Sequence, residues 1–476
     1  MRTGDVKTTQ HHHSAHCIVP PHVLEQIVRN APQEQRELAL RTLGTDTSTR
    51  VIRMTEQLLQ RVPKVQPLAA PHKQRLVYDA GNGGGLPGTL VRSEGQAGIG
   101  DAAADEAYDG FGSTFDLYWT VFGRNSIDNA GLNLQGTVHY LQGYDNAFWN
   151  GQQMVFGDGD GQYFNRFTIA IDVIGHELTH GVTANQANLV YHDQPGALNE
   201  SISDVFGSMV KQYAQSPQQT AANADWLIGA GLFTSAVHGV ALRSMKNPGT
   251  AYDDKVLGKD PQPADMANYV TTTNDNGGVH INSGIPNRAF YLAAVGLGGY
   301  SWDKAGRIWY ATLRDPRLTS TAQFQDFANL TTDNAAQLFG SSEQQVVADA
   351  WRQVGIQVGL PAISGNWILH YSWGSTTNYG QAAVAFNGDG TFSGSNAGQW
   401  RMHDGTLLLS FNGGPAKYAG TVDSNVANGE MSTFAGLDGS WYLTRQGIVG
   451  IMEDMSGGAL ARQQPLDAAG AAHVLL

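Results

Sequence analysis

Two histidines and a glutamate lie close together in the stretch Asp172–Val182, in the order His176, Glu177 and His180. On a helix, residues four apart share one face, so both imidazoles could bind one metal ion. Neutral imidazole is a good zinc ligand, but two ligands do not make a site. The pattern therefore predicts part of a zinc site and requires a third donor from elsewhere in the chain.

The stretch Ala197–Asp204 can supply that donor, because Glu200 and Asp204 lie one helical turn apart. Packed helices have axes ~8–10 Å apart, which is close enough to bring Glu200 beside the histidines. Two histidines and one glutamate leave zinc an open position, as in catalytic sites. Asp204 could then hydrogen-bond a ligating histidine, with Asn199 in a similar supporting role. Glu177 could accept a proton from zinc-bound water.

Both motifs must be held by helices. The spacing of apolar residues predicts such helices in the second half of the body. The first half is a β-type stretch with many glycines, and one helix near Ala103–Phe122 interrupts it. This order predicts an α+β body with a cleft at the junction between a β-rich lobe and a helical lobe. The expected helices after the β-rich part are Asp172–Thr183, Ala197–Tyr213, Ser283–Val295, Asp303–Thr312, Ala322–Gly340 and Ser342–Gly355.

Different patterns appear at the two ends of the chain. A short amphipathic helix is expected to begin at Pro21, and a second helix from Glu34 to Leu43 is expected to end at Gly44. Beyond Pro361, alternating apolar runs separated by Asn-Gly turns predict a small antiparallel sandwich or barrel. Four tryptophans of this region could stack on sugars or peptides or could fill its core, namely Trp367, Trp373, Trp400 and Trp441.

The predicted organisation has four parts. Residues 1–65 form a leader with helices, which we call the prefix. Residues 66–184 form the β-rich lobe with the zinc helix, residues 185–360 form the helical lobe, and residues 361–476 form the all-β domain. A chain of 476 residues is long enough for several such units.

Composition excludes several classes of function. The formal charge of -13 disfavours binding to nucleic acid. Cys17 is the only cysteine, so an internal disulfide is impossible. The sequence contains no apolar run of about 18 residues, so no membrane span is predicted. Met1–Val19 lacks the apolar core of a standard secretory signal.

Several further motifs carry a resemblance to a known family. They are Glu106–Asp109, Asn146–Trp149, Gly157–Gly161, Leu242–Met245 and Asp275–His280, together with the two zinc motifs. With these residues the chain resembles the thermolysin-like gluzincin peptidases, and among them the protealysin-like branch with a short propeptide. The resemblance implies a two-lobed, zinc-dependent neutral endopeptidase that is made as a zymogen and acts on proteins and peptides.

The resemblance also implies roles for single residues. Tyr191 and His280 would stabilise the tetrahedral intermediate, and Asp275 would orient His280. The substrate backbone would bind to Asn146, Ala147 and Arg243. An apolar pocket would favour cleavage before bulky hydrophobic residues, and its residues would be Phe164, Phe167, Val173 and Leu242.

The prefix is expected to inhibit the enzyme within the same chain. Pro20–Pro21 would lie near the zinc, residues 22–44 would cap the cleft, and the Cys17 thiolate could contact the metal. The histidines from His11 to His16 could bind additional zinc or could belong to a solvated leader.

Calcium is a second metal to consider. Asp172 and Asp225 match calcium ligands of the larger relatives, but Lys211 stands where a further carboxylate would be needed, and Leu227 and Ala230 replace two others. Calcium requires several oxygen donors, so the double site is expected to be lost. Binding elsewhere, for instance near Asp158 and Asp160, stays open.

Two other functions compete with the endopeptidase. One is a silent binding scaffold, which would be expected to lack Glu177, Tyr191 or His280. The other is a gluzincin aminopeptidase, which would need an acidic anchor for a free amino terminus. We expect a monomer that has neither nucleic-acid nor membrane partners. We also expect secretion by a non-standard route, with a cytoplasmic location as the alternative.

Overall fold

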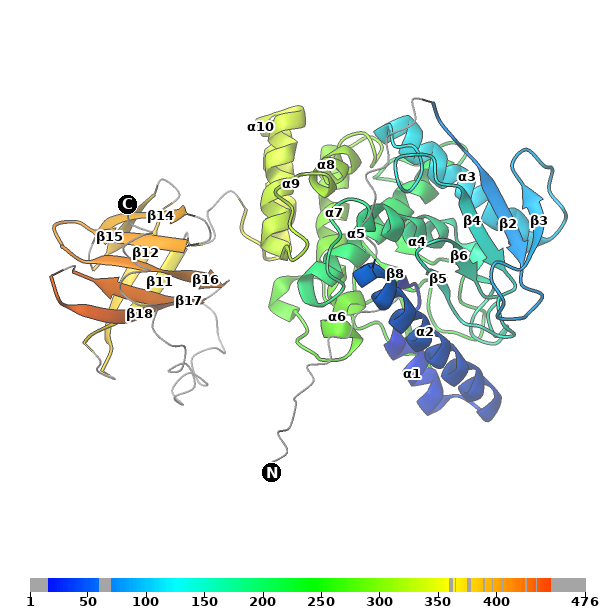
Figure 1. The fold of residues 1–476 in the computed structure, drawn as a ribbon, viewed down its shortest axis with the longest axis horizontal. Helices are drawn as coiled ribbons and strands as arrows, with labels where there is room; N and C mark the ends of the chain where they lie inside the picture. Colours follow the sequence, from blue (N-terminus) through cyan, green and yellow to red (C-terminus); the bar gives the residue numbers. More distant parts are fainter. Residues whose placement is uncertain are drawn as a thin grey trace. The chain divides into compact units, whose positions relative to one another are not determined.

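The structure of the chain is a computed structural model. It divides into two compact units, Met1–Val358 and Gly359–Leu476. In the first unit it describes residues 16–59 and 70–358. In the second it describes 363, 365–374, 378–387, 390–395, 397–403, 406–423, 426–433 and 435–446. Figure 1 shows a sheet on one side of the first unit and helices on the other.

The sheet of the first unit has six strands in the order β1-β5-β6-β4-β2-β3. Its strands are β1 (His16–Cys17), β2 (Arg75–Asp79), β3 (Thr89–Ser93), β4 (Leu134–Val138), β5 (Ala147–Trp149) and β6 (Met154–Phe156). Edge strand β1 belongs to the prefix and pairs antiparallel with β5, opposing His16 to Trp149 and Cys17 to Phe148. The prefix therefore completes the sheet of the lobe that it precedes.

Helix α3 (Ala102–Phe122) packs against this sheet and begins and ends at clear signals. The Asp101 side chain accepts the backbone N–H of Ala104, which caps the first turn. Gly123 ends the helix in the left-handed conformation with φ 64°. The helix expected near Ala103–Phe122 is thus confirmed almost to the residue.

Helices α4 (Ile171–Ala184) and α5 (Asp193–Ala214) carry the two zinc motifs and pack directly on each other. Gly207 of α5 makes this approach possible, because a Cβ there would lie 2.4 Å from the Asp172 carbonyl oxygen. The short distance between the helices brings Glu200 towards the two histidines, as the sequence predicts. Helix α5 begins before the expected start at Ala197, since the whole segment from Asp193 is helical.

The rest of the helical lobe follows the predicted order. Its helices are α6 (Asp275–Asn282), α7 (Gly284–Leu297), α8 (Ala305–Leu313), α9 (Phe324–Phe339) and α10 (Ser341–Gln353). Short strands β7 (Leu227–Ile228) and β8 (Arg243–Ser244) pair, as do β9 (Asp253–Asp254) and β10 (Gly258–Lys259). One apolar core extends through the sheet and these helices. Within the described residues, no helix has the length and apolar character needed to cross a membrane.

Two helices of the prefix lie against this body. Helix α1 (Pro21–Asn30) begins at a proline, as predicted, and buries Val23, Leu24 and Ile27. Helix α2 (Gln33–Leu59) does not end at Gly44, so that prediction is wrong. Glycine costs a helix only ~1 kcal/mol relative to alanine, and residues on both sides of Gly44 make buried contacts with the body.

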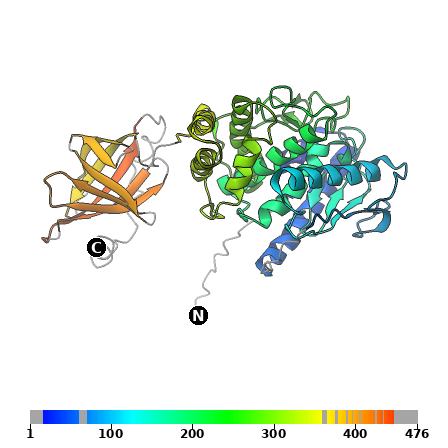
Figure 2. The ribbon, with the colours of Figure 1, turned by 90° about the horizontal axis from the view of Figure 1, so that it is seen from above.

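The second unit is a closed barrel of eight antiparallel strands, each paired with the next and the last with the first (Figure 2). The strands are β11 (Gly365–Trp373), β12 (Gly380–Phe386), β13 (Thr391–Gly394), β14 (Gly398–His403), β15 (Thr406–Phe411), β16 (Lys417–Asp423), β17 (Val426–Ser432) and β18 (Asp438–Arg445). Trp367, Trp400 and Trp441 are buried in its core, and Trp373 packs partly buried against it. The barrel is therefore confirmed over the sandwich, and three of the four tryptophans serve its core.

Candidate metal centre and active site

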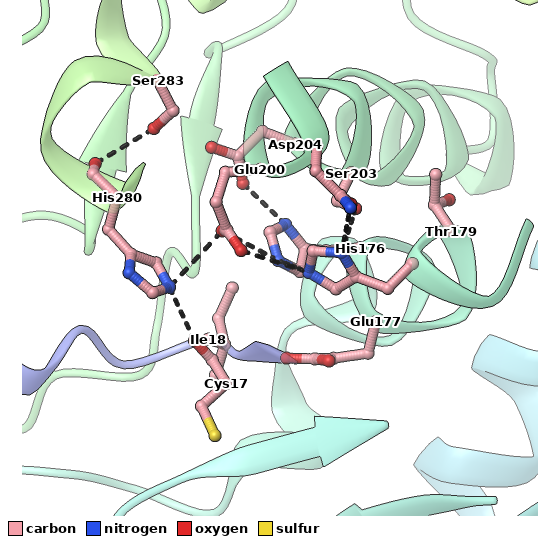
Figure 3. Close-up of polar contacts among 12 residues, drawn as sticks. Cys17, Ile18, His176, Glu177, Thr179, Glu200, Ser203, Asp204, His280 and Ser283 are labelled. Atoms are coloured by element: carbon pink, nitrogen blue, oxygen red, sulfur yellow. Dashed lines mark hydrogen bonds and ion pairs between the residues drawn. The ribbon is translucent and has the colours of Figure 1, made fainter. Parts of the chain in front are cut away.

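Three buried side chains meet between α4 and α5: His176, His180 and Glu200 (Figure 3). One ligand atom from each lies within 4.8 Å of the others. The two Nε2 atoms are 3.0 Å apart, and the Glu200 carboxylate lies 3.4 Å from His180 Nε2 and 3.5 Å from His176 Nε2. Two imidazole nitrogens and a carboxylate facing one point are the donor set of a catalytic zinc ion. The residues present therefore fit this metal.

Neighbouring side chains fix which ring nitrogen faces the metal position. Asp204 Oδ1 lies 2.8 Å from His176 Nδ1, and Asn199 Oδ1 lies 2.9 Å from His180 Nδ1. Both oxygens are acceptors, so each Nδ1 donates its hydrogen and each Nε2 is left with a lone pair for the metal. Asp204 and Asn199 thus lie where the sequence predicts supporting residues.

Ser203 is a further neighbour of the ligands, and it is absent from the residues expected from the sequence. Its hydroxyl lies 3.0 Å from His180 Nδ1. Ser203 follows Glu200 by three residues, and residues three apart share one helix face. That spacing is the signal from which its place beside the metal ligands could have been found.

Asp204 is also the centre of a buried ion-pair network. Arg243 donates to both of its carboxylate oxygens at 2.9 Å, and Asn287 donates to one of them at 2.8 Å. Burial alone would raise the pKa of Asp204, but Arg243 and His176 outweigh it and hold that pKa below its ordinary value. Asp204 therefore stays ionised as the partner of His176.

A third histidine, His280, faces the metal position from α6. Asp275 Oδ1 lies 2.6 Å from His280 Nδ1, and His280 Nε2 lies 3.2 Å from the Tyr191 hydroxyl. Burial works to lower the pKa of His280, but Asp275 and Glu200 raise it above its ordinary value. The Tyr191 hydroxyl also donates to Glu200. The structure thus brings Tyr191, His280 and Asp275 together at the metal ligands.

A local backbone reversal makes this position of His280 possible. Asn276, Gly277 and Gly278 adopt left-handed conformations inside α6, with φ between 50° and 82°. A Cβ on Gly277 would lie 2.0 Å from Asp193 Oδ1, so only glycine fits there. The two glycines of the Asp-Asn-Gly-Gly-Val-His sequence therefore allow the turn that precedes the histidine.

Glu177 lies on the other side of the metal ligands, next to strand β5. Its side chain is buried, and its Oε2 accepts the backbone N–H of Trp149 at 3.1 Å. This bond fixes the carboxylate beside strand β5. Glu177 and His280 consequently flank the metal position from two different elements.

The backbone of the prefix crosses this site. Ile18 donates its N–H to the Ala147 carbonyl at 3.2 Å, and the Ile18 carbonyl accepts from Arg243 at 3.0 Å. Asn146 Oδ1 accepts the Val19 N–H at 2.9 Å, and its Nδ2 donates to the Val19 carbonyl at 3.3 Å. The three residues expected to hold a substrate backbone therefore hold the prefix.

One expectation about the prefix is corrected, and another stays a prediction. The Cys17 carbonyl lies 3.1 Å from His280 Nε2, and a place of Pro20–Pro21 near the metal stays a prediction. The Cys17 sulfur does not face the metal ligands: it points away from them in Figure 3 and packs with Tyr144 and Phe148. Pairing of Cys17 with Phe148 in the sheet fixes the direction of its side chain. The histidines His11–His13 lie outside the described residues.

Helix α2 of the prefix contributes a buried carboxylate, Asp46, that is not among the residues expected from the sequence. It accepts the Tyr144 hydroxyl at 2.5 Å and the Asn146 amide at 2.9 Å. Thr42, one turn earlier, accepts the backbone N–H of Asp145 at 3.3 Å through its hydroxyl oxygen. A single aspartate in a polar stretch gives no signal of burial, so the sequence could not have revealed this contact.

The four residues expected to form an apolar pocket are all buried: Phe164, Phe167, Val173 and Leu242. They belong to the same continuous apolar cluster as Ile18. The rings of Phe164 and Phe167 are 5.7 Å apart. Their role in substrate preference stays a prediction.

Lys211 stands between the two aspartates that match calcium ligands. Its Nζ lies 2.9 Å from Asp225, 3.3 Å from Asp172 and 3.0 Å from the Leu227 carbonyl. Burial works to lower the pKa of Lys211, but Asp172 and Asp225 raise it above its ordinary value. An ammonium group therefore neutralises the carboxylates here.

The other two aspartates considered for calcium have protein partners of their own. Asp158 lies 2.7 Å from His139 Nδ1. Asp160 Oδ1 accepts three backbone N–H groups of its own loop, at 2.7–3.0 Å. Calcium binding near them stays a prediction.

Comparisons with known proteins agree with this geometry. Residues 47–184 match the family model of the thermolysin metallopeptidase catalytic domain, and residues 187–356 match that of its alpha-helical domain. An extracellular metalloprotease of Pectobacterium carotovorum is 55% identical over 344 residues, covering 72% of this chain and 96% of that protein. Protease PrtS of Photorhabdus is 47% identical, covering 72% of this chain and 92% of that protein.

A solved structure is similar as well. The precursor of protealysin, a metalloproteinase from Serratia proteamaculans, is 55% identical and matches with a TM-score of 0.65, covering 72% of this chain and 100% of that one. The α+β fold and the resemblance predicted from the sequence are therefore confirmed. The chain belongs to the thermolysin family of metallopeptidases and is a zinc metalloendopeptidase with His176, His180 and Glu200 as its zinc-binding cluster.

Proposed function

We propose that the enzyme is made as a zymogen and cleaves internal peptide bonds before bulky hydrophobic residues. One observation carries this proposal. A peptide segment of the chain itself, Cys17–Val19, already lies along strand β5 and uses Ala147, Asn146 and Arg243 as its backbone partners. Strand addition of this kind binds a peptide through its main chain.

The chemistry follows from the groups around that segment. A bound zinc ion would polarise the scissile carbonyl and lower the pKa of its water towards ~7. Glu177, fixed by the Trp149 N–H, is the base that takes the proton of the attacking water and passes it to the leaving amine. His280 and Tyr191 donate hydrogen bonds to the oxygen that becomes negative, and Asp275 keeps His280 in position. Each such donor typically contributes ~2.7–4 kcal/mol.

Substrate preference is assigned to apolar burial next to the site. Ile18, the first residue after the carbonyl that contacts His280, has an exposed fraction of 0%. A side chain in that position is removed completely from water, so each buried CH₂ would favour binding by ~0.8 kcal/mol. The cluster shared with Phe164, Phe167, Val173 and Leu242 supports a preference for bulky apolar residues there.

The prefix is assigned the role of intramolecular inhibitor. Its backbone occupies the partners that a substrate would need, and side chains of α1 and α2 hold it to both lobes. The similarity to a precursor of protealysin supports this role. Because two similar relatives carry the word extracellular in their names, we also assign the mature enzyme to the outside of the cell.

The prefix continues on both sides of the site, and this argues against an aminopeptidase. His16 pairs with Trp149 before the catalytic groups, and Val19 pairs with Asn146 after them. A polypeptide therefore continues in both directions, whereas an aminopeptidase closes one side around a free amino terminus. The presence of Glu177, Tyr191 and His280 argues against a silent scaffold.

Digestion of casein and of an N-blocked peptide, with and without 1,10-phenanthroline, tests the proposal. We expect both substrates to be cut before Leu, Ile or Phe, and we expect the chelator to stop both reactions. Cleavage of free peptides without cleavage of the blocked peptide would instead identify an aminopeptidase. No cleavage of either by the protein freed of its prefix would favour the scaffold.

A further inference from the structure

The hydrogen bonds of the prefix define its direction and its register in the site. The Cys17 carbonyl contacts His280, the Ile18 N–H and carbonyl contact Ala147 and Arg243, and both polar groups of the Val19 backbone contact Asn146. Successive backbone groups of the prefix thus have partners on the body. A slip by one residue would turn every side chain of the segment to the opposite face, because the side chains of a strand alternate between its faces.

The peptide bond between Cys17 and Ile18 lies among the catalytic groups in this register. Its carbonyl oxygen is 3.1 Å from His280 Nε2, which is itself 3.2 Å from the Tyr191 hydroxyl and 3.5 Å from Glu200. In the view of Figure 3, Cys17 and Ile18 lie between His280 and Glu177, with Glu200 above them. The bond therefore has a hydrogen-bond donor for its carbonyl on one side and a carboxylate base on the other.

Two buried side chains lock the bond in place. Ile18 has an exposed fraction of 0% and Cys17 of 1%. Ile18 belongs to the main core, whereas Cys17 belongs to a separate aromatic cluster with Tyr140, Tyr144 and Phe148. Since the two side chains fill different apolar environments, a neighbouring bond of the prefix could take the same position only if both side chains left them.

We propose that the enzyme hydrolyses the Cys17–Ile18 bond of its own prefix, so that this bond is a processing site within the chain. This inference rests on the proposed function. In the step, one water molecule is consumed and the C–N bond between Cys17 and Ile18 breaks. The water oxygen and the Cys17 carbonyl become a carboxylate. The Ile18 nitrogen leaves as an amine and takes up both protons of the water, the first of them carried by Glu177, so that it becomes an ammonium group.

The remaining prefix keeps its hold on the body after this cut. Val23, Leu24 and Ile27 of α1 stay buried, and Asp46 of α2 stays bound to the body. Pro20 and Pro21 follow directly, and a proline has no N–H to offer to the site. The cut therefore produces a nicked enzyme whose new amino terminus, Ile18, lies at the metal, and not yet a free one.

Mass spectrometry of the full-length, zinc-loaded protein tests this inference. We expect a fragment that ends at Cys17 and a partner chain that begins at Ile18. Glu177→Gln should give neither. Ile18→Asp should reduce this cut at least tenfold, because it places a charge at a fully buried position. Arg29→Gln changes an exposed prefix residue, whose partner is Glu25 at 3.5 Å, and should leave the cut unchanged.

Hydrogen exchange adds a readout that does not depend on catalysis. In the full-length Glu177→Gln protein, the Ile18 and Val19 amides should be protected, because both N–H groups are bonded to the body. Ile18→Gly removes the side chain without adding charge and should lower this protection while the amides of α4 stay protected. Rapid exchange of both amides in the Glu177→Gln parent would overturn the register.

The outcome of the cleavage experiments also distinguishes this inference from the proposed function. If the preparation cleaves an N-blocked peptide but never yields a chain that ends at Cys17, the inference is wrong and the function stands. If it does not cut its prefix and, once the prefix has been removed, does not cleave the peptide although it carries zinc, the proposed function itself fails.

Discussion

Acidification should loosen the prefix through one buried histidine, His22. This residue lies in the first turn of α1, 3.3 Å from the Tyr252 hydroxyl, and its buried Nδ1 has no hydrogen-bond partner among the described residues. Burial lowers the pKa of His22 to about 4, and nearby His280 and Arg243 act in the same direction against Asp275. The bound prefix therefore requires a neutral imidazole.

The sign and the size of the effect follow from linkage. His22 of a released prefix has the ordinary pKa of about 6.5, so prefix binding is unaffected above that pH and weakens as the pH falls from 6.5 towards 4. For these two pKa values, the equilibrium between bound and released prefix shifts towards release by a factor of about 30 at pH 5, or about 2 kcal/mol. At pH 7.5 the gain is close to none.

Hydrogen exchange of the α1 amides between Val23 and Ile27 measures this change. The protein should carry Glu177→Gln, so that it does not digest itself, and be compared with and without His22→Gln. Between pH 7.5 and pH 5, protection should fall about 30-fold further in the protein that retains His22 than in the His22→Gln variant. Other groups titrate in both proteins, so the difference isolates His22. An equal loss of protection in the two proteins would show that His22 is not responsible.

Three further outcomes are expected. Asp46→Asn should shorten the lag before activity appears in a precursor preparation. The reason is that Tyr144 and Asn146 lose a carboxylate partner worth about 1–3 kcal/mol. An unchanged lag would count against the contact. Lys211→Met should lower the free energy of unfolding by about 3 kcal/mol in urea titrations, because it leaves Asp172 buried without its cation. EGTA should hardly shift the melting temperature of the parent protein. Asp204→Asn should weaken zinc binding about 10–100-fold in a chelator competition, because His176 loses an ionised partner, whereas equal affinities would remove Asp204 from that role.

The zinc ligands could be predicted from the sequence because their geometry is local. His176 and His180 share a helix face by spacing alone, and Glu200 comes from a second amphipathic helix that must pack on the first. His280 is different. Its position depends on three consecutive left-handed residues in α6, and only the resemblance to a known family indicated where that turn leads.

The prefix was less predictable because its contacts are long-range. Nothing in the residues around Asp46 indicates that it meets Tyr144 and Asn146, about a hundred positions away in the chain. The same holds for His22, whose partner Tyr252 belongs to the helical lobe. These contacts form only once the whole body has folded, so no local pattern carries them.

Gly44 and the strands of the second unit illustrate the difference between long-range contacts and local sequence patterns. Glycine often follows a helix, which is why the sequence predicts an end at Gly44, but tertiary contacts of Thr42 and Asp46 outweigh that local preference. The antiparallel strands of the second unit, by contrast, follow from alternating apolar residues and turns that are visible locally. Their closure into a barrel and not a sandwich does not follow from that pattern.

The activity of a zinc-containing Glu177→Gln protein tests the proposed roles of the metal and of Glu177 most directly. We predict one zinc ion per chain in both parent and variant, because Glu177 is not among the three ligands, and loss of N-blocked peptide hydrolysis in the variant alone. Hydrolysis at the parental rate by the variant, or a parent that is active without stoichiometric zinc, would be incompatible with this mechanism.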